Sequence, residues 1–327
     1  MKIAIYQTLV GGGGGNDAVL FSLLDKYKND HVTLFCETLK IPVSCEVKEL
    51  SPVHIPIFGI YQNLLRSKTP REFAKYDEIH VLTGTMVYNT TKTPMTYYNQ
   101  NNFGDIIQDS KYSKGFWKIY YMPYKIMLAR FKKKIIKSNV RFVSNSYYAA
   151  KKLKNDFGID STVAYPTIKK EYYTLDKKNK LITLSRFSQE KNMEFVLSVF
   201  DFFGGGKVYA HISYANVPYY KKITRNSKST FHLNCERAEI TESLAEAKVY
   251  FCGSVETFGI AVIEGIASGC IPIVPDNSAH PETVPFPELR YKPNSLDDAI
   301  KKIQDAIDGK FDHLLPELKN HVERFYQ

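Results

Sequence analysis

Two glutamates, Glu256 and Glu264, are the side chains of this sequence best placed to do chemistry. The segment around them, residues 249–284, reads as a short apolar strand, a polar turn, a helix, a glycine stop and a second apolar strand. That order predicts one αβ unit of an open parallel sheet, and such sheets bind ligands at the carboxyl ends of their strands. Glu256 lies in the predicted turn and Glu264 in the predicted helix, so both belong to the expected binding region.

The turn before the predicted helix suits an anion, because the first N–H groups of a helix have no partner within it. These N–H groups belong to Thr257, Phe258, Gly259 and Ile260. Glu264, two turns deeper among apolar neighbours, needs a hydrogen-bond donor, and the hydroxyl pair of a ribose would supply two. The alternative is that Glu256 is a solvated turn residue and Glu264 a helix-surface residue, because charged side chains are mostly exposed.

Two cations, Arg186 and Lys191, lie five residues apart across a predicted strand-to-helix turn. Arginine offers a planar fork of donors and lysine a point charge, so the two can bind one diphosphate together. Two unrelated surface cations are the alternative. The acidic element downstream, with Glu256 and Glu264, favours the binding interpretation.

The run E-T-F-G-I-A-V-I-E-G-I-A-S-G-C-I-P-I-V, which starts at Glu256, resembles the E-x7-E signature of retaining glycosyltransferases of family 4. The run S-R-F-S-Q-E-K-N-M-E-F is similar to the R-x4-K element of that family. The resemblance implies the GT-B architecture, an α/β fold in which two Rossmann-like domains face each other across a cleft. It also implies that Glu256 faces the donor sugar and that Glu264 binds the nucleotide ribose.

The activity that the resemblance implies is retaining transfer of a hexose, with mannose and glucose as candidates, from a UDP- or GDP-sugar. Such a hexosyltransferase belongs to the EC 2.4 class, and its catalytic residues would be Arg186, Lys191 and Glu256. The expected acceptor is a glycan or a lipid-linked glycan, because residues 144–166 most resemble enzymes that extend lipid-linked oligosaccharides. No Asp-x-Asp pair occurs, so we expect protein cations in place of a metal, and no cofactor. The alternative is a catalytically silent nucleotide-sugar- or glycan-binding protein of the same fold.

A glycine run, Gly11–Gly15, separates a predicted strand at Lys2–Tyr6 from a predicted helix. The backbone of such a loop can approach a phosphate or a sugar closely. A merely flexible loop is the alternative from the residues alone. In the resembled family a glycine-rich loop lies here beside the donor diphosphate, which assigns Gly13 and Gly14 to donor binding.

The acceptor side is where the sequence departs from the resembled family, whose members often carry a catalytic histidine in an H-x-H or a Y-x-H-Y-P run. His80 is followed by Leu82 at the second histidine position of H-x-H, and Asn99 stands where the other run would have its histidine. Within an apolar strand, His80 is better interpreted as a core histidine than as a catalyst. Thr85, Asn99 and His80 are the acceptor-side candidates.

A basic amphipathic helix is predicted over residues 116–137, after which the chain returns to strand patterning. Its apolar positions form a helical stripe at Tyr124, Met127, Leu128, Phe131 and Ile135. Lysines and an arginine surround that stripe, which is typical of a helix lying on an anionic membrane. The alternatives are a core helix with a solvated lysine face and, in third place, a nucleic-acid-binding helix; we expect no nucleic-acid partner.

Length and composition fit two cored domains. The chain has 327 residues, 44% of them hydrophobic, and a net charge of +10. We expect an acceptor-binding domain over residues 1–165, a nucleotide-sugar-binding domain over 166–312, and a terminal helix over 313–327 that crosses back to the first domain.

The five cysteines form no C-x-x-C pair, so we expect reduced thiols and no metal cluster. The N-terminus does not read as a signal peptide and no apolar run is long enough to span a bilayer. The expected location is the cytoplasm, peripherally at the inner face of the membrane.

Overall fold

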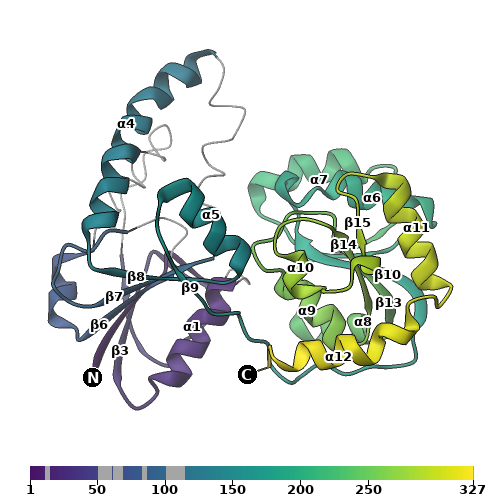
Figure 1. Cartoon of the computed structure of the whole chain (residues 1–327), viewed down its shortest axis with the longest axis horizontal. Coiled ribbons are helices and arrows are strands. Elements are labelled where there is room, and N and C mark those ends of the chain that lie inside the picture. Colours follow the sequence, from purple (N-terminus) through teal and green to yellow (C-terminus); the bar gives the residue numbers. More distant parts are fainter. Residues whose placement is uncertain (12–14, 51–60, 62–68, 83–86, 101–114, 327) are drawn as a thin grey trace. The chain divides into compact units, whose positions relative to one another are not determined.

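The chain forms two compact α/β units, residues 1–166 and 167–327. Its computed structural model describes residues 1–11, 15–50, 61, 69–82, 87–100 and 115–326 (Figure 1). The predicted domain boundary after Tyr165 lies beside the observed division.

The first unit contains a seven-stranded parallel sheet in the order β5-β3-β1-β6-β7-β8-β9. Its strands are β1 (Lys2–Tyr6), β3 (His31–Cys36), β5 (Glu46–Glu49), β6 (Glu78–Val81), β7 (Met95–Asn99), β8 (Val140–Ser144) and β9 (Thr162–Val163). A separate short pair is formed by β2 (Leu9–Val10) and β4 (Thr38–Leu39). The α-helices described in this unit are α1 (Gly15–Lys26), α4 (Gly115–Lys137) and α5 (Tyr147–Phe157).

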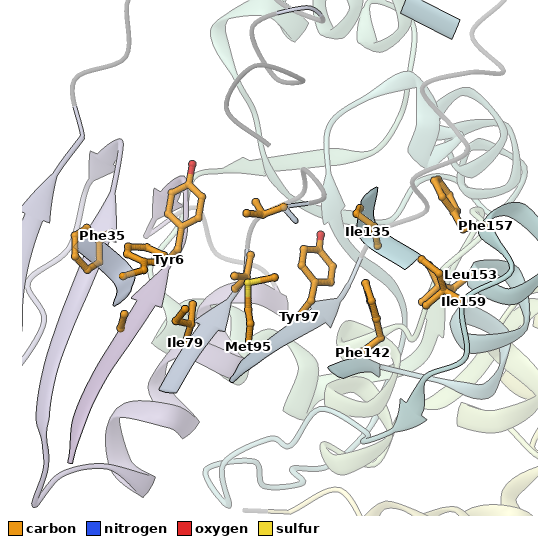
Figure 2. Close-up of a cluster of buried hydrophobic side chains, with 14 residues drawn as sticks. Tyr6, Phe35, Ile79, Met95, Tyr97, Ile135, Phe142, Leu153, Phe157 and Ile159 are labelled. Carbon is orange, nitrogen blue, oxygen red and sulfur yellow. The ribbon is translucent and has the colours of Figure 1, made fainter. Parts of the chain in front are cut away.

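Both faces of this sheet are buried, as the central strand β1 shows. Ala4 and Tyr6 point into one apolar cluster, and Ile3 and Ile5 point into another on the opposite face. Figure 2 shows the first cluster, in which rings and aliphatic side chains from successive strands lie side by side. Side chains alternate between the faces of a strand, and a strand apolar on both faces is typical of a parallel sheet covered on both sides.

The helix predicted over 116–137 is present as α4, and Figure 1 shows it running out beyond the edge of the sheet. Part of its predicted apolar stripe packs inside the protein. Tyr124 and Ile135 are buried, and Ile135 belongs to the core cluster. A different apolar row is exposed instead. It consists of Phe116, Ile119, Met122 and Ile126. The prediction that the Tyr124–Ile135 face meets lipid is therefore wrong for those two residues, since they pack in the first unit.

The second unit contains a six-stranded parallel sheet in the order β12-β11-β10-β13-β14-β15. Its strands are β10 (Lys178–Arg186), β11 (Lys207–His211), β12 (Thr230–Leu233), β13 (Ala247–Phe251), β14 (Ile271–Pro275) and β15 (Arg290–Tyr291). Its α-helices are α6 (Met193–Phe202), α7 (Val217–Thr224), α8 (Arg237–Glu246), α9 (Ile260–Ala267), α10 (His280–Thr283), α11 (Leu296–Ile307) and α12 (Leu315–Glu323). Strands alternate with helices along the chain, which is the Rossmann-like arrangement expected from the sequence.

The terminal helix α12 packs within the second unit. Leu318 and Val322 are buried, and α12 packs on α9. Phe325 is fully buried against the ring of Phe258, with 5.4 Å between ring centroids. The expected crossing of residues 313–327 to the first unit stays a prediction.

Candidate active site

The loops after β10 and β13 leave the second sheet at the same edge, because these two strands are parallel neighbours. Arg186 is the last residue of β10, Lys191 lies in the loop that follows it, and Glu256 lies in the loop after β13. The two loops are joined directly, since the Asn192 side-chain amide donates to the Gly253 carbonyl over 3.1 Å. Asn192 has a left-handed backbone, a conformation that asparagine tolerates better than most residues. The predicted basic and acidic elements are thus neighbours.

Lys191 and Glu256 form an ion pair at this edge. The Lys191 Nζ lies 2.6 Å from Glu256 Oε1, and the two side chains are 14% and 21% exposed. The Ser254 hydroxyl donates to the same carboxylate oxygen over 3.0 Å. The carboxylate is therefore fixed in position, yet it remains accessible to a ligand.

The turn that carries Glu256 is braced by the segment after β14. The Glu256 N–H donates to the Ser278 hydroxyl, and the Glu256 carbonyl accepts from the Ala279 N–H, both over 3.2 Å. Buried His280 places its Nε2 3.0 Å from the Ser254 carbonyl. Burial lowers the pKa of His280, so its imidazole is neutral and Nε2–H is the donor to that carbonyl.

The start of α9 lies next to this turn. Gly259 adopts a left-handed backbone with φ of 93°, which only glycine adopts without strain, and α9 begins at Ile260. The Phe258 side chain points into the protein, where it packs on Phe325. Phe258 can therefore serve a ligand only through its backbone. The predicted anion site over Thr257–Ile260 stays a prediction, and the chain geometry is compatible with it.

Arg186 differs from Lys191 in its surroundings. Its side chain is 61% exposed and pairs with Glu190, in the turn after β10, over 2.6 Å. An exposed pair of this kind contributes little to stability and rearranges readily. Arg186 is thus an exposed cation at the end of β10, whereas Lys191 is a largely buried cation held by Glu256.

Glu264 is buried in α9, and its partner is a residue that the sequence analysis did not select. Arg237, the first residue of α8, reaches both oxygens of the Glu264 carboxylate; its Nη1 lies 3.3 Å from Oε2, and Nη2 contacts Oε1. The same guanidinium contacts Glu171 over 3.4 Å and lies over the Tyr172 ring. Burial raises the pKa of the Glu264 carboxyl, and the Arg237 guanidinium opposes that shift.

The apolar neighbours of Glu264 in the sequence indicated that its carboxylate is buried and needs a partner. A carboxylate that is only 8% exposed needs a cation or several donors, from the protein as well as from a ligand. Helix α8 begins at Arg237, and its first residue thereby brings the guanidinium to Glu264. The expected ribose diol would therefore share Glu264 with Arg237.

The acceptor-side candidates have structural surroundings where they are described. His80 is buried on β6, with Nδ1 3.3 Å from the Tyr98 hydroxyl and Nε2 3.4 Å from Glu78. Burial lowers the pKa of His80 to about 4, which keeps the ring neutral. Asn99 is buried at the end of β7 and donates to the Ser144 hydroxyl over 3.2 Å. The other predicted ligands of the first unit, Thr85, Gly13 and Gly14, lie outside the described residues.

Side chains able to hold a metal ion come together once among the described residues. They are His232, Cys235 and Glu239, at the end of β12 and the start of α8. Neither Lys191 nor Glu256 belongs to this group.

Comparison with a family model bears on the second unit. Residues 220–324 match the model of glycosyl transferases group 1. The matched segment includes Arg237, Glu256 and Glu264, and it excludes Arg186 and Lys191. No curated protein matches the chain at a significant level.

Solved structures match the whole chain in fold. HepE (Alr3699) of Anabaena, solved with UDP and glucose, has 13% identity and a TM-score of 0.75, with 100% of this chain and 96% of that chain covered. Sucrose-phosphate synthase of Thermosynechococcus elongatus has 14% identity and a TM-score of 0.75, with 100% and 95% covered. WaaG, a glycosyltransferase involved in lipopolysaccharide biosynthesis, has 12% identity and a TM-score of 0.69, with 98% and 93% covered.

These likenesses identify the fold of the chain. The chain has the GT-B fold of glycosyltransferases, which confirms the fold predicted from the sequence. Its second unit carries a segment of the glycosyl transferases group 1 type.

Proposed function

We propose that the protein is a retaining glycosyltransferase that moves a hexose from a nucleoside diphosphate sugar to a glycan or lipid-linked acceptor. The observation that carries the proposal is the Lys191–Glu256 ion pair at the carboxyl edge of β10 and β13. Open α/β sheets bind ligands at this edge. The segment of group 1 type and the GT-B fold support the proposal, as does HepE, a structural neighbour solved with UDP and with UDP-glucose.

In this proposal the cations receive the charge that develops on the departing diphosphate. The Lys191 ammonium has three donors and gives one to Glu256, which leaves two for phosphate oxygens. Arg186, exposed at the rim, would swing from Glu190 to the diphosphate. Positioned donors of this kind are each worth roughly 10²–10³ in rate, so the protein would need no metal at the diphosphate.

The carboxylates would hold the two ends of the donor. Glu256, fixed by Ser254 and Lys191, presents an acceptor to the hydroxyls of the sugar. Glu264 would accept from the ribose. A carboxylate has about four lone-pair positions, so the Arg237 fork leaves room for hydroxyl donors on Glu264.

Helix α4 is the proposed docking surface for an anionic membrane, which would hold the lipid-linked acceptor. The exposed row of Phe116, Ile119, Met122 and Ile126 supplies apolar area. Exposed lysines flank it, which suits anionic headgroups. No helix in the described part of the chain is long and apolar enough to cross a bilayer.

Vesicle sedimentation tests this docking surface. The double variant Ile119→Ser/Ile126→Ser should lose binding to vesicles that contain phosphatidylglycerol, because both side chains are exposed and the fold does not need them. Equal binding by the variant and the parent would remove α4 from the proposal. The location at the cytoplasmic face of the inner membrane stays a prediction, which cell fractionation checks.

A second candidate is a catalytically silent protein that binds a nucleotide sugar or a glycan. The surroundings of His80 and Asn99 favour it, because both side chains are buried and hydrogen-bonded inside the first unit. Neither is presented to an acceptor as a catalytic group would be. Donor turnover separates the two candidates.

A thermal-shift panel of UDP- and GDP-sugars, followed by a turnover assay with lipid extract, tests the proposal. A ligand at 100 times its dissociation constant stabilises the folded state by about 2.7 kcal/mol, which such a panel detects. A shift with turnover supports the transferase, and a shift without turnover supports the silent protein. No shift with any nucleotide sugar would contradict the transferase and the silent protein that binds a nucleotide sugar.

A further inference from the structure

Three side chains with metal-ligand chemistry converge at the junction of β12 and α8. They are His232, Cys235 and Glu239, and one donor atom from each lies within 4.8 Å of the others. His232 Nδ1 is 2.9 Å from Glu239 Oε1. A tetrahedral zinc ion with bonds of about 2.0–2.3 Å needs donor atoms separated by roughly 3.3–3.8 Å. Small side-chain movements would therefore turn this hydrogen-bonded group into a ligand set.

The chain is shaped to bring these side chains together. Asn234, between His232 and Cys235, has a left-handed backbone with φ of 56°. Its N–H donates to the Ala210 carbonyl over 2.9 Å, and its side chain accepts from the Ile212 N–H over 3.1 Å. The turn is thus fixed to β11, and it brings Cys235 back toward the strand that carries His232.

Neighbouring side chains hold His232 and Glu239 in position. The His232 ring stacks on the buried Tyr209 ring, with 4.4 Å between centroids and 15° between planes. The Tyr209 hydroxyl lies 3.3 Å from Glu239 Oε1 and 2.6 Å from the Ser243 hydroxyl. The nearby cation Lys207 donates to Ser243, over 3.0 Å. A ligand set whose members are held by packing and outer hydrogen bonds is characteristic of metal sites.

The chemistry of the donors selects the kind of metal. One imidazole, one thiol and one carboxylate suit zinc and similar borderline-soft divalent ions better than magnesium or calcium, which prefer oxygen ligands. Three protein ligands leave a fourth position for water, and His232 and Glu239 are both accessible from solvent. The three residues have the spacing H-x2-C-x3-E, which differs from the C-x-x-C spacing common in zinc sites.

We propose that His232, Cys235 and Glu239 form a zinc-class metal site that fixes the turn between β12 and α8. Arg237 lies in the same turn, so the metal would also hold in place the guanidinium that pairs with Glu264. The site is separate from Lys191 and Glu256, and it adds no metal to the proposed diphosphate-binding residues. The proposal does not depend on glycosyl transfer.

Cobalt titration of the full-length protein tests the site directly. After treatment with a chelator, Co²⁺ should give the near-ultraviolet absorption of a thiolate–cobalt bond and the visible bands of four-coordinate cobalt, and Zn²⁺ should abolish both. Cys235→Ser should lose the thiolate band, while the control Cys45→Ser, at a partly buried cysteine in the first unit, should keep it. Tyr209→Phe should weaken cobalt binding roughly 10–100-fold, because it removes only the outer hydrogen bond.

Two results would overturn the proposal. One is a parent protein that gives no thiolate–cobalt band, and the other is a band that persists unchanged in Cys235→Ser. If Cys235→Ser lowers the melting temperature, His232→Gln provides the same test at a second ligand, read from the four-coordinate cobalt bands. Both readouts are independent of nucleotide sugars, so a failed transferase assay leaves them interpretable.

Discussion

Glu256 and Glu264 belong to one loop and helix, but their surroundings differ. Glu256 lies in a turn, is 21% exposed, and meets a lysine and a serine hydroxyl. Glu264 lies inside α9, is 8% exposed, and meets the fork of Arg237. The first is held in place and remains accessible; the second is held and enclosed.

This difference in exposure predicts which pair of the site serves turnover and which serves folding stability. A partly exposed carboxylate can exchange its partner for a ligand at little cost in folding free energy. A buried carboxylate cannot lose its partner without leaving a charge unsatisfied. We therefore expect changes at the Lys191–Glu256 pair to affect turnover, and changes at the Arg237–Glu264 pair to affect folding first.

The largest expected effect is that of Lys191→Met on turnover. It removes the positioned cation and should lower kcat roughly 10²–10³-fold, while the melting temperature stays close to that of the parent. Lys178→Met is the matched control, because Lys178 also forms an ion pair and lies at the start of β10, away from the loop that carries Lys191. Equal losses in the two variants, measured by nucleoside diphosphate release, would remove the special role of Lys191.

Arg186→Ala should lower kcat about 10²-fold and leave donor affinity nearly unchanged, since Arg186 acts in this account only as charge moves to the diphosphate. Its exposed pair with Glu190 contributes little to folding, so the free energy of unfolding should change by less than about 0.5 kcal/mol. Steady-state kinetics and urea unfolding measure the two quantities. A loss of affinity without a loss of kcat would assign Arg186 to ground-state binding.

Arg237→Ala should destabilise the second unit by about 1–3 kcal/mol, because it leaves the Glu264 carboxylate buried without its charged partner. The lower part of that range is expected, since the Arg237 side chain is 44% exposed and water can replace part of it. Urea unfolding measures the loss. Arg237→Ala/Glu264→Leu, which removes both charges, should recover much of it, and a double variant as unstable as the single one would contradict this reasoning.

The same variant should respond to pH in a defined direction. Burial already raises the pKa of Glu264, and removal of the opposing guanidinium raises it further. A carboxyl whose pKa is higher in the folded state loses stability as pH rises through that pKa. The deficit of Arg237→Ala should therefore be largest near pH 7.5 and shrink toward pH 5, and a deficit independent of pH would show that Glu264 keeps its charge.

Glu264→Ala should weaken donor binding with little effect on kcat, because the proposed ribose contact is the same in the ground state and the transition state. A donor titration followed by thermal shift measures the affinity. Unchanged affinity would show that Glu264 serves Arg237 alone.

The last effect concerns His80 in the first unit and develops only as the pH falls below about 6.5. Burial lowers its pKa to about 4, so the unfolded chain binds a proton more readily than the folded one between about pH 6.5 and 4. Stability should fall as pH falls through that window, and His80→Gln should reduce the fall by up to about 3 kcal/mol. His31→Gln, at an exposed histidine, is the control. Identical pH profiles of both variants and the parent would contradict the buried, neutral assignment.

Much of the fold was predictable because it follows from local patterns. The strand predicted at Lys2–Tyr6 is β1 with the same bounds, and the helix predicted over residues 116–137 is α4. The GT-B prediction depended on the two motifs of the second unit, and the fold comparison confirms it.

The partners of the site residues were less predictable, because they come from distant parts of the chain. Arg237 and Glu264 are 27 residues apart, with strand β13 between their helices, and no local sequence pattern links them. The face of α4 that is buried depends on what packs against it, so the stripe containing Tyr124 and Ile135 could not be assigned to lipid or protein from its spacing alone. Periodicity locates an apolar face, but the tertiary structure decides what covers it.

The assignment of Glu256 to the reacting sugar can be tested by nucleoside diphosphate release. The parent, Glu256→Gln and Glu264→Gln are compared, each with a saturating nucleotide sugar. Glutamine keeps the shape of each side chain and removes its charge. We predict that Glu256→Gln still binds the donor but loses roughly 10²–10³-fold in kcat, while Glu264→Gln keeps kcat within about tenfold. A Glu256→Gln variant that turns over at the parental rate would contradict the assignment of Glu256 to the reacting sugar.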